Sequence, residues 1–262
     1  MRSTSLDYAK KALSHFMPDR NDKWNHKAQS GNPTQATEVN DVIKYIRRLE
    51  VRHQGKPSQA RLAFTAKEYC NIIAAIEAMD DDEMRLFLSA IFRYQYNMGA
   101  RIDDSSKKMW GNLKKHTNDA HSLYALISQL CWSKNIFEER QAPDQILFGA
   151  ANRYFCVLVG LASWLEYWLA KDHYRKTPYL FGINGIDDPE TIKRKASDAL
   201  KKILGEDDTF DEVIEVMAEC ERKLGTHSMR KFATTIAAEN WVPNDAIDCR
   251  YVPPSLSYFF FR

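Results

Sequence analysis

The first residues that could do chemistry are a histidine and an arginine three positions apart. His227 and Arg230 lie in the stretch LGTHSMRKFATTIAA, which begins at Leu224. Side chains at i and i+3 of a helix share one face, so the imidazole and the guanidinium can converge on one target. A permanently charged planar fork beside a hydrogen-bonding ring suits a phosphate group. The pair fits an ordinary exposed helix equally well, because short motif matches are often accidental.

Two further cations precede this pair in the chain. Arg101 follows a glycine turn and stands three residues before Asp104, and Lys134 lies in the turn-forming sequence WSKN. Each has an ordinary alternative. Arg101 could be a cation after a helix C-terminus, Lys134 could be solvated in its turn, and Asp104 could cap the following segment.

The elements that must position these residues are mostly helical. Thr65 and Glu68 form a capping-box pattern, and Gly99 closes the apolar helix that runs from Met84 to Tyr96. Short extended pieces are expected near the middle of the chain, so the fold class is α+β, predominantly α-helical, with a small antiparallel sheet. We expect extended segments at 110–113 and 123–132, a return strand beginning at 136–137, and helices at 154–170, 191–204 and 210–223.

The N-terminal region is basic. Residues 1–58 carry 11 Lys/Arg against 6 Asp/Glu, a net charge of +5, whereas the remainder carries about −3. We expect a helix at 3–16, a polar loop at 17–37 and an amphipathic helix at 39–51. This charge suits contact with a DNA backbone, although a solvated helix face explains it as well. The sequence GKPS from Gly55 to Ser58 marks the expected boundary between domains 1–58 and 59–262. The candidate DNA contacts are Lys44, Arg47, Arg48 and Arg52.

Composition excludes several classes of protein. The five cysteines are scattered and show no metal-ligand spacing, so reduced thiols and an intracellular location are expected. The N-terminus lacks the apolar core of a signal peptide. The longest apolar run, from Tyr154 to Ala170, contains Glu166 and falls short of a spanning length, so a buried helix is expected rather than a membrane segment.

In their order along the chain, Arg101, Lys134, His227 and Arg230 resemble the catalytic residues of tyrosine recombinases, the phage-integrase-like enzymes. FTAKE at 64–68 resembles the opening helix of that family, and YNMGARIDD at 96–104 resembles its first box. WSKN lies where the family keeps a hairpin lysine. GTHSMRK at 225–231 resembles the second box, with a form similar to eukaryotic Crypton-like members. The resemblance covers roughly residues 60–250.

The resemblance implies a catalytic domain that cuts and rejoins double-stranded DNA through a 3′-phosphotyrosyl intermediate. Arg101 and Arg230 would stabilise the phosphoryl transition state, and His227 would handle protons or donate to the phosphate. Lys134 would protonate the leaving 5′-oxygen, and Asp104 would orient Arg101. The resemblance further implies DNA integration by a mobile element, no metal or cofactor, a homo-oligomer on DNA, a nuclear location if the source is eukaryotic, and a partial core-binding domain at 1–58.

The nucleophile is the weakest part of the resemblance. Family members place a His or Trp and then the nucleophilic Tyr well after the second box. Here no His or Trp follows Trp241. Tyr258 is the candidate nucleophile and Tyr251 is the alternative, although Tyr258 lies in an apolar tail that could equally pack. The alternative function is that of a catalytically inactive relative which acts as a DNA-binding or protein-interaction module.

Overall fold

The computed structural model is mostly helical with one small antiparallel sheet, and this confirms the α+β class expected from the sequence. The chain divides into two compact units, Met1–Gln59 with Glu219–Glu221, and Ala60–Ala218 with Arg222–Arg262. Among the described residues, no helix is both long and apolar enough to cross a membrane. The structure describes residues 2–55, 61–116, 125–129, 144–172, 177–183, 188–206, 224–240 and 242.

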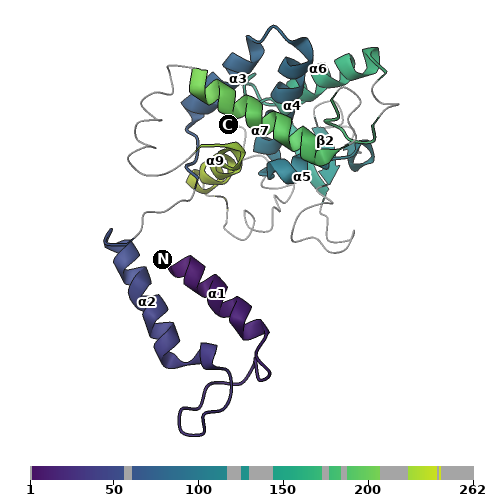
Figure 1. The fold of residues 1–262 in the computed structure, drawn as a ribbon. Helices are drawn as coiled ribbons and strands as arrows, with labels where there is room; N and C mark the ends of the chain where they lie inside the picture. The colour runs from purple at the N-terminus through teal and green to yellow at the C-terminus, as the bar shows by residue number, and fades with distance from the viewer. Residues whose placement is uncertain are drawn as a thin grey trace. The chain divides into compact units, whose positions relative to one another are not determined.

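The first unit is an antiparallel pair of helices, α1 (Ser3–His15) and α2 (Thr37–Val51), which lie side by side in Figure 1. Both helices were expected from the sequence. Polar contacts fasten them along their length. The Ser3 hydroxyl donates to a Glu50 carboxylate oxygen at 2.6 Å, and Lys10 Nζ donates to Asn40 Oδ1 at 2.5 Å. An ion pair between Asp7 and Arg47 adds a third link between the helices.

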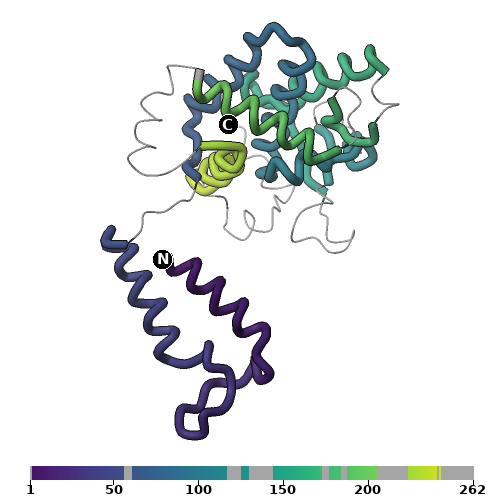
Figure 2. Tube along the Cα trace, viewed as in Figure 1, coloured from purple at the N-terminus to yellow at the C-terminus, as the bar shows by residue number. Residues whose placement is uncertain are grey.

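A buried asparagine fixes the connection between these helices, whose path is clear in Figure 2. Asn32 caps the short 3₁₀ helix η1 (Pro33–Gln35), and its Oδ1 accepts from the Thr34 backbone N–H at 3.0 Å. Its Nδ2 donates to the Ser14 hydroxyl at 2.6 Å and to the Arg20 carbonyl at 2.9 Å. Gly31 has a φ of +90°, and a Cβ there would lie 2.4 Å from the Lys23 carbonyl oxygen, so only glycine fits.

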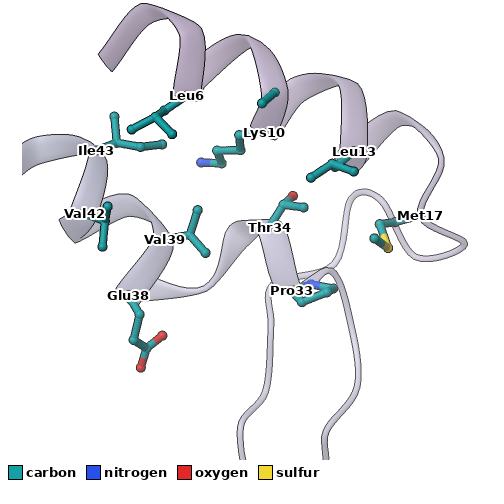
Figure 3. Close-up of a pocket in the computed structure, with 11 residues that line it drawn as sticks. Leu6, Lys10, Leu13, Met17, Pro33, Thr34, Glu38, Val39, Val42 and Ile43 are labelled. Atoms are coloured by element: carbon teal, nitrogen blue, oxygen red, sulfur yellow. The ribbon is translucent and has the colours of Figure 1, made fainter. Parts of the chain in front are cut away.

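An apolar groove of about 560 Å³ lies between α1 and α2 (Figure 3). Leu13 of α1 and Val42 of α2 line it and are 57% and 55% exposed, whereas Ile43 is buried. Two helices alone cannot cover both of their apolar stripes, so part of each stripe stays in contact with solvent.

The second unit is built around α4 (Asp82–Met98), in which every residue from Phe87 to Gln95 is buried. A Cβ at Gly160 would lie 3.2 Å from the Ser89 carbonyl oxygen, so α6 (Val157–Ala170) approaches α4 closely there. Within this core, Arg93 is 1% exposed and its Nη2 donates to Glu77 at 2.6 Å. The expected Thr65–Glu68 capping box is confirmed at the start of α3 (Ala66–Glu77). Figure 1 shows α3, α6, α7 (Pro189–Glu206) and α9 (Thr226–Glu239) around α4.

The sheet has three antiparallel strands in the order β1 (Leu113–Lys115), β2 (Ala125–Gln129) and β3 (Asp144–Phe148). Leu126 pairs with Leu147 in the β2–β3 register. Buried Lys108 links the end of β2 to the residue just before β1, because its Nζ donates to the carbonyls of Asn112 at 2.5 Å and Gln129 at 2.8 Å.

Two expectations near the sheet need correction or remain open. Trp110–Asn112, expected to be extended, forms the 3₁₀ helix η2. The reason is tertiary, since the Trp110 ring packs on Trp168 with centroids 4.2 Å apart and the Trp110 backbone N–H donates to the Pro178 carbonyl oxygen at 3.2 Å. The expected return strand at 136–137 and the expected helix at 210–223 lie outside the described residues, and β3 was not expected as a strand.

Candidate functional site

The C-terminal end of α4 places Arg101. Gly99 ends the helix in the left-handed region with a φ of +54°, and Arg101 then becomes the extended N-cap of α5 (Ile102–Ser106). Asp104 is 3% exposed, and its Oδ2 accepts from the Arg101 backbone N–H at 3.2 Å. Asp104 therefore acts on Arg101 through the main chain, as the capping alternative expected, and its orientation of the guanidinium stays a prediction.

The other half of the site stands at the start of α9. Gly225 is the N-cap of this helix, which begins at Thr226. The Gly225 N–H donates to the Ser228 hydroxyl at 3.1 Å, so a side chain one turn later stabilises this end. Gln95 of α4 donates to the Thr226 carbonyl at 2.7 Å and anchors α9 to the core.

Burial of one face of α9 leaves the chemical pair on another. Ser228, Met229 and Phe232 are buried, whereas His227 is exposed and Arg230 is half-buried. Because both residues lie in α9, their i,i+3 spacing puts the imidazole and the guanidinium on the same side of the helix.

The charges around His227 show which residues gather there. Partial burial lowers the pKa of His227 below its ordinary value of 6.5, and the positive charges of Arg101, Arg61 and Arg230 lower it further. Asp104 acts in the opposite direction. These charged side chains therefore lie close enough to His227 to act on its imidazole. The structure thus brings Arg101, His227 and Arg230 together, whereas Lys134, Tyr251 and Tyr258 lie outside the described residues.

Arg61 is a member of this cluster that the sequence did not reveal. Its Nη1 donates to the Leu224 carbonyl at 3.1 Å, just before α9 begins, and Lys231 Nζ donates back to the Arg61 carbonyl. A Cβ at Gly225 would lie 3.7 Å from the guanidinium, so Arg61 covers the N-cap. No spacing pattern connects Arg61 with residues more than 160 positions later, so only the fold could show this contact.

The cluster keeps donors available for an anion. Within the described part of the chain, the His227 ring and the Arg101 guanidinium make no hydrogen bond or ion pair, and the Arg61 guanidinium makes only the bond to Leu224. Several forked donors around a ring nitrogen suit a phosphate or another oxyanion. No set of three or more His, Cys, Asp or Glu side chains that could hold a metal ion gathers among the same residues.

The electrostatics of His227 predict how its titration responds to a ligand. With a lowered pKa, the folded chain binds fewer protons near pH 6 than the unfolded chain, so the contribution of His227 to stability is lost as pH falls through this range. A bound anion should raise its pKa, because the anion offsets the arginine charges. NMR titration of the imidazole with and without short duplex DNA measures both effects. Titration at or above pH 6.5 in the free protein would contradict this electrostatic environment.

Acidic side chains partly neutralise the basic face predicted on α2. Lys44 lies 3.5 Å from Asp41, and Arg47 pairs with Asp7 of α1. Arg48 and Arg52 are exposed, and neither side chain has an ion pair within the described residues. Arg47 therefore helps to fasten the helix pair, and a role for these four residues in DNA binding stays a prediction.

Comparison with known proteins does not assign this site, so its assignment depends on its geometry. No family model and no curated protein matches the chain. Among solved structures, the crystal structure of XerA recombinase is 18% identical in sequence, and the alignment covers 98% of this chain and 83% of that chain with a TM-score of 0.45. A likeness at this level assigns neither a family nor an activity.

Proposed function

We propose that the second unit binds a phosphodiester of double-stranded DNA and transfers the strand to a tyrosine of the chain, in the manner of tyrosine recombinases. The observation that carries the proposal is the gathering of Arg61, Arg101 and Arg230 around His227. It is supported by the order of these residues along the chain, which resembles the family's boxes.

In this proposal Arg101 and Arg230 bind the non-bridging phosphate oxygens through forked hydrogen bonds, and these bonds strengthen as negative charge grows there. His227 is mostly neutral at pH 7 because its pKa is lowered, so its ring can accept a proton as well as donate one. A neutral imidazole can accept the proton that a nucleophilic hydroxyl releases, and the nearby arginine charges favour its return to the neutral form afterwards.

The strand transfer is a balanced exchange of phosphate esters. The tyrosine oxygen forms a bond to phosphorus and loses its proton, while the bond to the 5′-oxygen breaks and that oxygen gains a proton. We assign the nucleophile to Tyr258, with Tyr251 as the alternative, and the proton donor to Lys134. No nucleotide cofactor is needed, because the phosphotyrosyl ester conserves the energy of the broken bond.

A nicked duplex tests the proposal. The nick lets the short cleaved piece diffuse away, so a phosphotyrosyl adduct accumulates and remains attached to the protein in denaturing gels. Because the target sequence is unknown, the substrate is a pool of nicked duplexes with randomised sequence. We expect an adduct that Tyr258→Phe removes and Tyr251→Phe leaves. The reverse pattern would assign the nucleophile to Tyr251. An adduct that persists in both variants would contradict both assignments.

The runner-up function is a module that binds DNA without cutting it. It is favoured by the basic N-terminal region, because residues 1–58 carry a net charge of +5. This function predicts salt-sensitive binding to duplex DNA and no adduct with any member of the pool. If the protein shows neither DNA binding nor an adduct, both functions are rejected.

A further inference from the structure

A second cationic site lies in the first unit, far along the chain from the group formed by His227, Arg61, Arg101 and Arg230, which we call the histidine cluster. A polar pocket of about 630 Å³ is formed by the C-terminal half of α1, the connection after it and the first turn of α2. Its other lining side chains are uncharged and polar, and no Asp or Glu among the described residues lines it. The cations that line the pocket are Lys10, Lys11, Arg20 and Lys23, and the His15 ring lies beside them.

Hydrogen bonds hold the connection that carries Arg20 and Lys23 against η1 and its N-cap, just before α2 begins. The Arg20 carbonyl accepts from Asn32 Nδ2 at 2.9 Å and from Gln35 Nε2 at 2.6 Å. Lys23 forms a backbone bridge with Asn32, and the close approach of Gly31 to the Lys23 carbonyl seals this contact. Two cations from a long connection are thereby placed beside the cations of α1 before any ligand arrives.

The positive charge in the pocket is largely uncompensated. Within the described residues, Lys11, His15, Arg20 and Lys23 make no ion pair and donate no side-chain hydrogen bond, whereas Lys10 donates to Asn40. Like charges held together repel one another, so a polyanion that neutralises them binds favourably. The basic face of α2 differs, because Asp41 and Asp7 already neutralise two of its cations.

The start of α2 adds backbone donors to the same pocket. Its N-cap, Ala36, supplies no side-chain hydrogen bond, and Thr37 lines the pocket. The N-terminal N–H groups and the positive end of the helix dipole therefore face no side-chain acceptor at the cap. Glu38, the acidic residue of this first turn, is paired with His26 at 3.0 Å and lies outside the pocket lining.

We propose that this pocket binds a phosphate group of a DNA backbone. The contact surface of the first unit is then the junction of α1, the connection and the start of α2, rather than the face of α2 predicted from the sequence. All the residues that line the pocket belong to the first unit, so the contribution of the pocket cations to duplex binding does not depend on strand cleavage by the second unit.

Duplex binding by the full chain, measured by fluorescence anisotropy over a range of salt concentrations, tests the pocket. Lys11→Gln with Lys23→Gln removes two pocket cations, and Lys44→Gln with Arg48→Gln removes two exposed cations from α2 as the matched control. Each lost phosphate contact lowers the slope of log affinity against log salt by about 0.9. We expect the pocket pair to lower the slope by about 1 to 2 and the control pair to leave it unchanged. Thermal melts confirm that both pairs fold.

The other outcomes overturn the proposal. An equal decrease of the salt slope in both double variants would mean diffuse attraction of DNA to the whole unit. A larger decrease in the control variant would place the DNA on α2. A separate titration with inorganic phosphate follows the amide signal of His15. Saturation by phosphate with no effect of the pocket pair on DNA binding would assign the pocket to a free anion. Absence of strand cleavage in the parent protein, with duplex binding that still depends on Lys11 and Lys23, would reject the proposed function and leave this inference standing.

Discussion

Replacing Arg230 with alanine should abolish adduct formation on nicked DNA while leaving the fold as stable as the parent. Arg230 lies half-buried on α9, and its positive charge acts on His227. The proposed function therefore assigns its guanidinium to the phosphate. Removing one such donor from a transition state costs about 100- to 1,000-fold in rate. Arg230→Lys keeps the charge without the fork and should recover only part of that loss. The rate of adduct formation under single-turnover conditions measures the effect.

Arg194→Ala is the matched control for this change. Arg194 is an exposed arginine of α7 whose charge acts on Asp188, so its removal should leave the rate unchanged. A second measurement separates chemistry from structure, since Arg230→Ala should also move the pKa of His227 upwards toward its ordinary value. A large loss of stability on Arg230→Ala would mark this residue as structural. A rate equal to that of Arg194→Ala would remove it from the site.

Truncation of Leu161 to alanine should lower the free energy of unfolding by about 2–5 kcal/mol. Leu161 is 1% exposed on the face of α6 that packs against α4, so the shorter side chain leaves a cavity in the centre of the second unit. Close packing of α6 on α4 at Gly160, one residue earlier, limits how far the helices can move to fill it. Denaturant unfolding of the full chain measures the loss in the transition of the second unit.

The same helix offers a control with the same chemical change. Leu169 lies on α6 and is 59% exposed, so Leu169→Ala removes the same atoms without opening a cavity. We expect its effect to stay within about 0.5 kcal/mol, as for most surface substitutions. Equal losses for the two variants would show that helix propensity, rather than packing against α4, determines the effect.

The sequence predicted the features that depend on neighbouring residues. The Thr65–Glu68 capping box, the end of α4 at Gly99 and the shared face of His227 and Arg230 each follow from spacing within one helix. Local hydrogen bonds and helix periodicity decide such features, so a single sequence contains enough information to find them. The buried position of Leu161 in an apolar helix was predictable for the same reason.

The features that sequence reasoning missed depend on distant contacts. Trp110 turns into a 3₁₀ helix because it packs on Trp168, and Arg61 reaches the site because it bonds to Leu224. Strand β3 (Asp144–Phe148) has little alternation of its own and is defined by its pairing with β2. The pocket around Arg20 depends on the buried side chain of Asn32, and the burial of this residue cannot be predicted from a polar loop sequence.

The last two turns of α4 support both halves of the histidine cluster. Gln95 anchors the first turn of α9, and Gly99 sets the direction in which the chain continues to Arg101. Fraying of this helix end therefore disperses the arginines and the imidazole in a single event. In hydrogen–deuterium exchange, the amides at the starts of α5 and α9 should become labelled together at low denaturant, so the anion site should vanish as a unit before the core of the domain melts.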